Sequence, residues 1–334
     1  MINGIINVYK EKGYTSHDVV ARLRGILHQK KIGHTGTLDT DAEGVLPVCL
    51  GKGTKLCGLL TDKRKTYEAV LHLGLDTDTQ DISGVVKREC EVRVSQEEVR
   101  ACMESFVGEQ MQIPPMYSAL KVKGKKLYEL AREGIEVERQ PRPVTFYEIR
   151  ILSMELPFVR FSVTCSKGTY IRTLCHDIGE KLGCMGCMES LLRTRVDRFD
   201  IQDSLKLSAI EEKKIQGKLE EAIVSVEEMF ADYPAFYAAE TFTKMLKNGN
   251  AIPAEKPEHT GRVRMYTETG IFVGLYEWQE VKGQYKPVTI FSSPEDFHSA
   301  GALQKTTGRS SYELYNRNSS FGTGSTKRRD AGKI

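Results

Sequence analysis

Two kinds of apolar periodicity interleave along the first 200 residues, and their order limits the folds open to this chain. Apolar side chains alternate with others over residues 66–75 and 159–165, which predicts β-strands. A Ser-x-x-Glu capping box opens a helical pattern over 95–106, and a second helical pattern covers 171–182. The order shows neither the regular alternation of a βαβ fold nor its GxGxxG turn. We therefore expect a mixed α+β body.

The chain changes character in its last third. Short alternating segments at 262–266 and 271–277 predict a small β-rich module, so we divide the 334 residues into a main domain at 1–230, a module at 231–293 and a tail at 294–334. The tail is basic and rich in Gly, Ser, Thr and Asn. We expect it to be disordered, as an RNA-contacting arm or a dispensable extension.

Composition excludes several classes of protein. No run approaches the roughly 18 apolar residues of a membrane helix, and the N-terminus lacks the pattern of a signal peptide. Eight cysteines scattered along a long chain indicate free thiols rather than a disulfide framework. These features predict a cytoplasmic protein without membrane association.

A Gly- and Thr-rich stretch at 33–56 carries Asp39 and leads into an apolar segment, so we expect a shaped loop followed by a buried element. An aspartate in such a loop is more often a turn-former than a catalyst. Arg172 changes that balance, because it lies off the apolar stripe in the first turn of a predicted helix. A cation there meets the positive end of the helix dipole, which an opposing carboxylate would relieve. Asp39 is the candidate partner, although Arg172 alone could be a solvated surface residue.

Other polar clusters are weaker signals. The acids Asp76, Asp78 and Asp81 lack the spacing of a calcium loop, and we interpret them as a capped turn. The lone CxxC at 184–187 does not complete a zinc site, and GKGTK at 51–55 does not complete a phosphate loop. We expect no metal, nucleotide or other cofactor. Lysine-rich clusters at 28–31, 63–65 and 121–126 are either solvated faces or, if they converge, a footprint for a nucleic acid backbone.

Four segments together resemble the bacterial TruB family, the tRNA pseudouridine synthases that modify uridine 55 in the TΨC arm. They are GHTGTLDTDAEGVLP, KTYEAVLHLGLDTDTQD, IPPMYSALKVKGKKLYELAREG and CSKGTYIRTLCHDIGEKLG. The resemblance covers about residues 2–200 and continues more weakly beyond. It implies the pseudouridine synthase fold, a mainly antiparallel sheet flanked by helices, with a small PUA-like RNA-binding module at 231–293.

The resemblance also implies roles for single residues. Asp39 corresponds to the catalytic aspartate, Tyr67 to the active-site tyrosine and Arg172 to the arginine that pairs with the aspartate. His34 would lie against the T-loop, and Tyr170 and Leu192 would line the uracil pocket. The segment 114–142 would form a thumb that positions RNA phosphates through Lys121, Lys123, Lys125 and Lys126.

The expected reaction breaks the N1–C1′ bond, turns the uracil and rejoins it through C5, so it needs no redox group. Asp39 could attack C1′, or it could help a base such as Tyr67 remove the C2′ proton. The target base must leave its stack, and Tyr67 is the candidate floor for it. We expect a monomer that acts on tRNA.

Two alternatives stay open at this stage. One is a protein that binds and folds the tRNA elbow, with catalysis secondary. The other is a guide-RNA-dependent synthase of the archaeal and eukaryotic kind, against which the long KVKGKKLYELAREG segment favours the stand-alone bacterial form.

Overall fold

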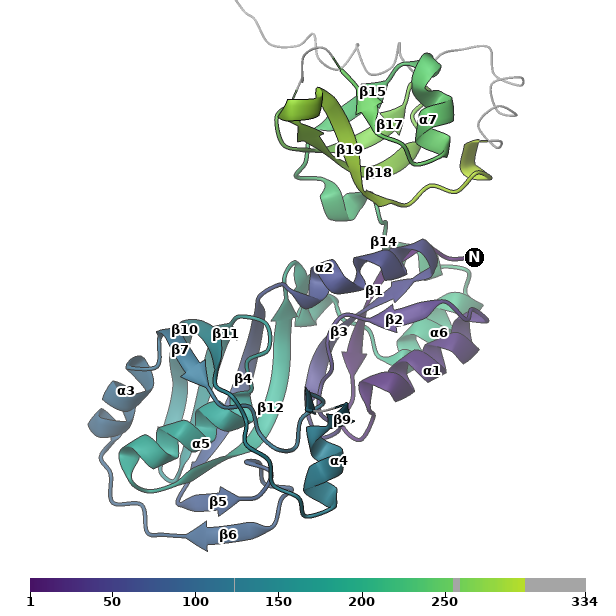
Figure 1. Cartoon of the computed structure of the whole chain (residues 1–334). Coiled ribbons are helices and arrows are strands. Elements are labelled where there is room, and N and C mark those ends of the chain that lie inside the picture. Colours follow the sequence, from purple (N-terminus) through teal and green to yellow (C-terminus); the bar gives the residue numbers. More distant parts are fainter. Residues whose placement is uncertain (123, 255–258, 298–334) are drawn as a thin grey trace, which may run out of the picture. The chain divides into compact units, whose positions relative to one another are not determined.

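The computed structural model describes residues 1–122, 124–254 and 259–297, which belong to two units (Figure 1). The first unit runs from Met1 to Val226, and the second begins at Glu227. Lys123 and most of the predicted tail, from residue 298 onward, lie outside the described residues. In the three described ranges, no helix has the length and apolar character needed to cross a membrane.

One large sheet organises the first unit. In spatial order its strands are β14 (Ile223–Val224), β1 (Gly4–Lys10), β3 (Glu43–Leu50), β12 (Gly186–Val196), β4 (Lys65–Leu73), β11 (Phe158–Cys165), β10 (Arg142–Glu155) and β7 (Gly108–Gln112), with β2 (Ile32–His34) on β3 and β13 (Phe199–Asp200) on β12. Within the described chain its strand pairs are antiparallel, except that β3 runs parallel to β12. The predicted mixed α+β body is confirmed.

Two groups of helices cover two halves of this sheet. Helices α3 (Gln96–Glu104) and α5 (Ile171–Leu182) share one apolar core with β4, β10, β11 and β12. Helices α1 (Ser16–Leu27) and α6 (Leu207–Ile215) share a second core with β1 and β3. Both helices predicted from periodicity are present, and the predicted capping box closes the N-terminus of α3. Figure 1 shows α5 lying along β12.

Shorter elements connect the strands and helices of the first unit. They are η1 (Gly51–Leu56), α2 (Cys57–Thr61), α4 (Leu127–Arg132), the hairpin of β5 (Leu75–Thr77) with β6 (Val86–Glu89), and the hairpin of β8 (Lys121–Val122) with β9 (Lys125–Lys126). The strand predicted over 66–75 is too long by two residues, because Gly74 takes a φ of +87° and its amide donates to carbonyls of the turn before β12. In the Gly-rich stretch, residues 33–34 end β2, residues 35–42 form the loop, and β3 is the expected buried element.

The two halves of the sheet meet where β3 and β12 pair, with Arg193 opposite Gly44. Gly44 has a φ of +107°, and a Cβ atom there would lie 2.2 Å from the Arg193 carbonyl oxygen. Only glycine permits so close an approach in that conformation. The loop that carries Asp39 joins β2 to β3 and therefore enters the sheet at this junction.

The second unit contains a five-stranded sheet in the order β15 (Ala235–Ala238), β17 (Arg262–Thr267), β18 (Phe272–Gln279), β19 (Gln284–Ile290) and β16 (Ile252–Pro253). A short helix, α7 (Thr243–Lys247), precedes β16, and the aromatic side chains of Tyr276 and Tyr285 are buried in the core of the unit. Strands β17 and β18 lie over the two segments predicted to be extended.

Because α5 packs closely against the turn before β12, we expect a glycine-to-alanine substitution inside this helix to destabilise the protein. Gly179 lies inside α5, and a Cβ atom there would lie 2.1 Å from backbone atoms of Met185 and Gly186. We expect Gly179→Ala to lower the free energy of unfolding by about 2 kcal/mol or more, although alanine is the better helix former by about 1 kcal/mol. Urea unfolding of the purified protein measures this.

Gly25→Ala is the matched control, because Gly25 lies in α1 with no atom within 4 Å of an added Cβ. This substitution should raise the free energy of unfolding by about 0.5–1 kcal/mol. Equal effects of the two substitutions would contradict the tight packing of α5.

Candidate active site

The site is organised around an ion pair between Asp39 and Arg172. The Nε atom of Arg172 lies 3.1 Å from Oδ2 of Asp39, as the sequence predicted for a carboxylate facing the first turn of α5. The Arg172 side chain is 6% exposed, whereas the Asp39 side chain is 51% exposed. The buried guanidinium therefore fixes a carboxylate that a large substrate can still reach.

Arg172 is itself held by backbone carbonyls from two other segments. Its Nη1 donates to the Thr79 carbonyl at 3.0 Å, and its Nη2 donates to the Tyr117 carbonyl at 2.8 Å. A second carboxylate, that of Asp81, lies 3.7 Å from Nη1. Since a guanidinium presents its donors in a rigid fork, these contacts fix the direction in which Nε points at Asp39.

Lys10, at the end of β1, binds the backbone of the loop that carries Asp39. Lys10 is fully buried, and its Nζ donates to the carbonyls of Ala42 at 2.6 Å and Thr40 at 3.1 Å. On the other side of Asp39, the Leu38 amide donates to Ser16 Oγ at 2.9 Å. These bonds hold the loop on both sides of the carboxylate.

Burial lowers the pKa of Lys10 from 10.5 to about 8, because loss of hydration outweighs the attraction of Asp39 and nearby acids. Between these two pKa values the unfolded chain holds more protons than the folded chain, so the free energy of unfolding rises with pH. Between pH 7 and pH 10, the free energy of unfolding of wild type should rise by about 1–2 kcal/mol more than that of Lys10→Met, after allowance for solvent screening. Urea unfolding of both proteins at several pH values measures the difference, and parallel curves would contradict it.

Tyr67 lies on β4 with its side chain in the apolar core and only 8% of the residue exposed. Burial raises the pKa of its hydroxyl, although the Arg193 guanidinium acts in the opposite direction. Tyr67 is therefore a neutral phenol near pH 7, which disfavours it as the group that removes the first proton.

The other predicted pocket residues come from three different elements. His34 ends β2, its ring makes an edge contact with His17, and burial lowers its pKa, so the ring is neutral near pH 7. Tyr170 is half-buried at the start of α5, where the Gln112 side chain bonds to both its amide and its carbonyl. Leu192 is half-buried on β12, next to the junction with β3.

The predicted thumb reaches the site through Tyr117. Tyr117 supplies the carbonyl to Arg172, and its hydroxyl donates to Asp78 at 3.1 Å. Lys121, Lys125 and Lys126 lie on the short β8–β9 hairpin, and the helix α4 follows it. Within the described residues, no hydrogen bond or ion pair joins these lysines to Asp39, Tyr67 or Arg172.

Sequence reasoning missed Lys10, Asp81 and Arg193. Asp81 was interpreted only as part of a capped turn, and it does accept hydrogen bonds from Thr79 and Ser83 there. It also approaches Arg172. Arg193 directly follows Leu192 in the SLLRT segment, where a charge in an apolar strand was the available signal.

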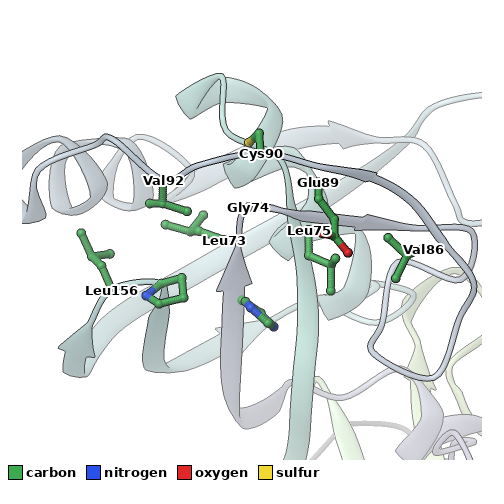
Figure 2. Close-up of a pocket in the computed structure, with 10 residues that line it drawn as sticks. Leu73, Gly74, Leu75, Val86, Glu89, Cys90, Val92 and Leu156 are labelled. Carbon is green, nitrogen blue, oxygen red and sulfur yellow. The ribbon is translucent and has the colours of Figure 1, made fainter.

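A separate hollow of about 770 Å³ lies at the far end of β4 and contains none of the predicted site residues. Figure 2 shows its mixed lining, with the apolar side chains of Leu73, Leu75 and Val92 beside Glu89 and Cys90. Neither Asp39 nor Arg172 lines it, so it does not enter the proposed chemistry.

Comparison with known proteins identifies the family. Residues 24–171 match the N-terminal domain of the TruB family pseudouridylate synthases, and 172–231 match the C-terminal domain of tRNA pseudouridylate synthase B. The chain is 50% identical over 306 residues to the tRNA pseudouridine synthase B of Lachnoclostridium phytofermentans, which covers 87% of this chain and 100% of that protein. This chain belongs to the TruB family. A relative of the same name from Clostridium tetani is 46% identical, over 86% of this chain and 99% of that protein.

Solved structures agree with the fold of the TruB family. A Cbf5-Nop10-Gar1 complex contains a chain that is 27% identical, with a TM-score of 0.66, covering 88% of this chain and 86% of that one. An H/ACA RNP bound to a substrate RNA contains one that is 26% identical, with a TM-score of 0.64 and the same coverage. The predicted pseudouridine synthase fold is confirmed, and this TruB-family chain is a pseudouridine synthase, an isomerase.

Proposed function

We propose that this protein isomerises uridine 55 to pseudouridine in the TΨC arm of tRNA, with Asp39 as the central catalytic residue. The observation that carries the proposal is the Asp39–Arg172 pair, a solvent-accessible carboxylate fixed by a buried arginine. The relatives named tRNA pseudouridine synthase B, at 42–50% identity, support tRNA as the substrate.

The chemistry balances within one nucleotide. The N1–C1′ bond breaks, the uracil turns, the C5–C1′ bond forms, the hydrogen on C5 leaves to solvent as a proton, and N1 takes up a proton from solvent. Asp39 can take part by attacking C1′ or by removing the C2′ proton. Because Tyr67 enters as a neutral phenol, its role in the first step is to contact the base rather than to act as the base catalyst.

Access to the target requires that uridine 55 leave its stack in the RNA. Only 8% of Tyr67 is exposed, so half-buried Tyr170 and Leu192 would supply the rest of the uracil pocket. The neutral ring of His34 would then occupy the space that the base leaves in the T-loop.

Recognition of the remaining RNA rests on charge. The thumb lysines, Lys121, Lys123, Lys125 and Lys126, would contact phosphates, and the β-rich second unit would act as a PUA-like RNA-binding module. We further propose that the protein works as a monomer. Its eight free thiols suit the reducing cytoplasm, which we propose as its location.

The test uses tRNA transcript carrying tritium at uracil C5, with no guide RNA or partner protein added. Release of about one tritium per tRNA is expected, and a transcript with cytidine at position 55 should release none. Tight binding without release would favour the RNA-folding alternative. Release only with an added guide RNA would favour the guide-dependent alternative.

A further inference from the structure

Arg193 is the most deeply buried arginine among the described residues of the first unit, with 1% of its surface exposed. No carboxylate lies within ion-pair distance of it in the described part of the chain. A buried guanidinium without a counter-charge is costly unless its donors are used, so its placement needs a reason.

Two backbone carbonyls fix the Arg193 guanidinium. Its Nε donates to Val45 at 2.7 Å, and its Nη2 donates to Gly36 at 3.1 Å. Gly36 lies three residues before Asp39, and a Cβ atom on it would lie 3.8 Å from Nη1 of Arg193. The guanidinium is therefore clamped between β3 and the loop that carries the proposed catalytic aspartate.

The strand register directs Arg193 toward Tyr67. Strands β12 and β4 are antiparallel, and Arg193 pairs directly with Tyr67, so the two side chains share one face of the sheet. The Arg193 guanidinium acts to lower the pKa of the Tyr67 hydroxyl, against the larger effect of burial. Among the described residues, the hydrogen bonds of Arg193 to backbone use the Nε–H and one N–H of Nη2, which leaves both N–H groups of Nη1 and the second one of Nη2.

We propose that Arg193 is a positioning residue that orients the Tyr67 hydroxyl toward the bound uracil. An arginine can only donate hydrogen bonds, so the phenol oxygen must accept from it. The hydroxyl hydrogen then points away from Arg193 and is available to a carbonyl oxygen of the base. When the glycosidic bond breaks and the uracil gains negative charge, this donor is already aligned.

This inference rests on the proposed function, since it assigns a role within the same reaction. It differs from a purely structural role for Arg193, in which the guanidinium only ties the Gly36 and Val45 carbonyls together. A structural role would operate with or without the Tyr67 hydroxyl. A positioning role would disappear when that hydroxyl is absent.

A double-mutant cycle separates the two roles. Single-turnover tritium release is measured for wild type, Arg193→Met, Tyr67→Phe and the double variant, with tRNA affinity and thermal unfolding measured beside it. Arg193→Met should slow release about 100-fold in the wild-type background and at least about tenfold less in the Tyr67→Phe background. Equal losses in the two backgrounds would overturn the inference, and no release by wild type would instead refute the proposed function.

Lys65→Met is the matched control, because Lys65 is also a buried cation but donates to the carbonyls of Thr61 and Lys63. Lys65→Met should change the rate of tritium release by the same factor in the wild-type and Tyr67→Phe backgrounds.

A second measurement does not depend on catalytic activity. The ¹³Cζ resonance of Tyr67, assigned by its loss in Tyr67→Phe, should shift in Arg193→Lys and Arg193→Met but not in Lys65→Met. An unchanged resonance in folded Arg193 variants would overturn the inference.

Discussion

Asp39→Asn is expected to abolish tritium release from tRNA, by a factor of at least about 10⁴, while tRNA affinity stays within about threefold of wild type. The amide keeps the size of the carboxylate and can still accept from Arg172, but it can neither attack C1′ nor take the C2′ proton. Single-turnover release and filter binding with the same transcript measure the two effects. Release within tenfold of wild type would remove Asp39 from the centre of the reaction.

Asp41→Asn provides the control for a change of charge in the same loop. Asp41 is exposed two residues further along, and its side chain has no ion pair within 4 Å in the described chain. We expect release within about twofold of wild type, because exposed charges of this kind contribute little. A large loss of release in Asp41→Asn would mean that catalysis depends on the net charge of the loop rather than on the chemistry of Asp39.

The Asp39–Arg172 pair could be predicted because each member leaves a local signal in the sequence. Asp39 lies among glycines that resist regular structure, and Arg172 lies off an apolar stripe at the unfavourable end of a helix dipole. Each signal can be recognised from the residues next to it in the sequence. The pairing of Asp39 with Arg172 then follows from their opposite charges.

Lys10 and Arg193 could not be predicted in the same way, because their main partners are backbone carbonyls. Every residue has a carbonyl, so an acceptor of this kind leaves no residue-type pattern in the sequence. Their positions also depend on the order of the sheet. The parallel contact of β3 with β12 joins segments far apart in the chain, and its only sequence trace is a glycine, Gly44.

Arg172→Met is expected to reduce tritium release about 10³-fold, the second largest effect after Asp39→Asn. The variant leaves Asp39 without the donor that fixes it, and it leaves the Thr79 and Tyr117 carbonyls without their partner. Because these carbonyls belong to the segments around Asp81 and the thumb, the free energy of unfolding should also fall, by about 3 kcal/mol. Release assays and urea unfolding measure both effects.

Arg172→Lys separates charge from geometry at this position. A lysine restores the positive charge, but its single ammonium cannot reproduce the fork that meets Asp39 and two carbonyls at once, so release should remain at least about 30-fold below wild type. Arg88→Met is the surface counterpart, since Arg88 also bridges two carboxylates, Asp76 and Glu180, with its side chain 52% exposed. It should change stability by less than about 1 kcal/mol and leave release unchanged. Full activity in Arg172→Lys would show that a positive charge alone suffices beside Asp39, and the fixed direction of the guanidinium would then have no part in catalysis.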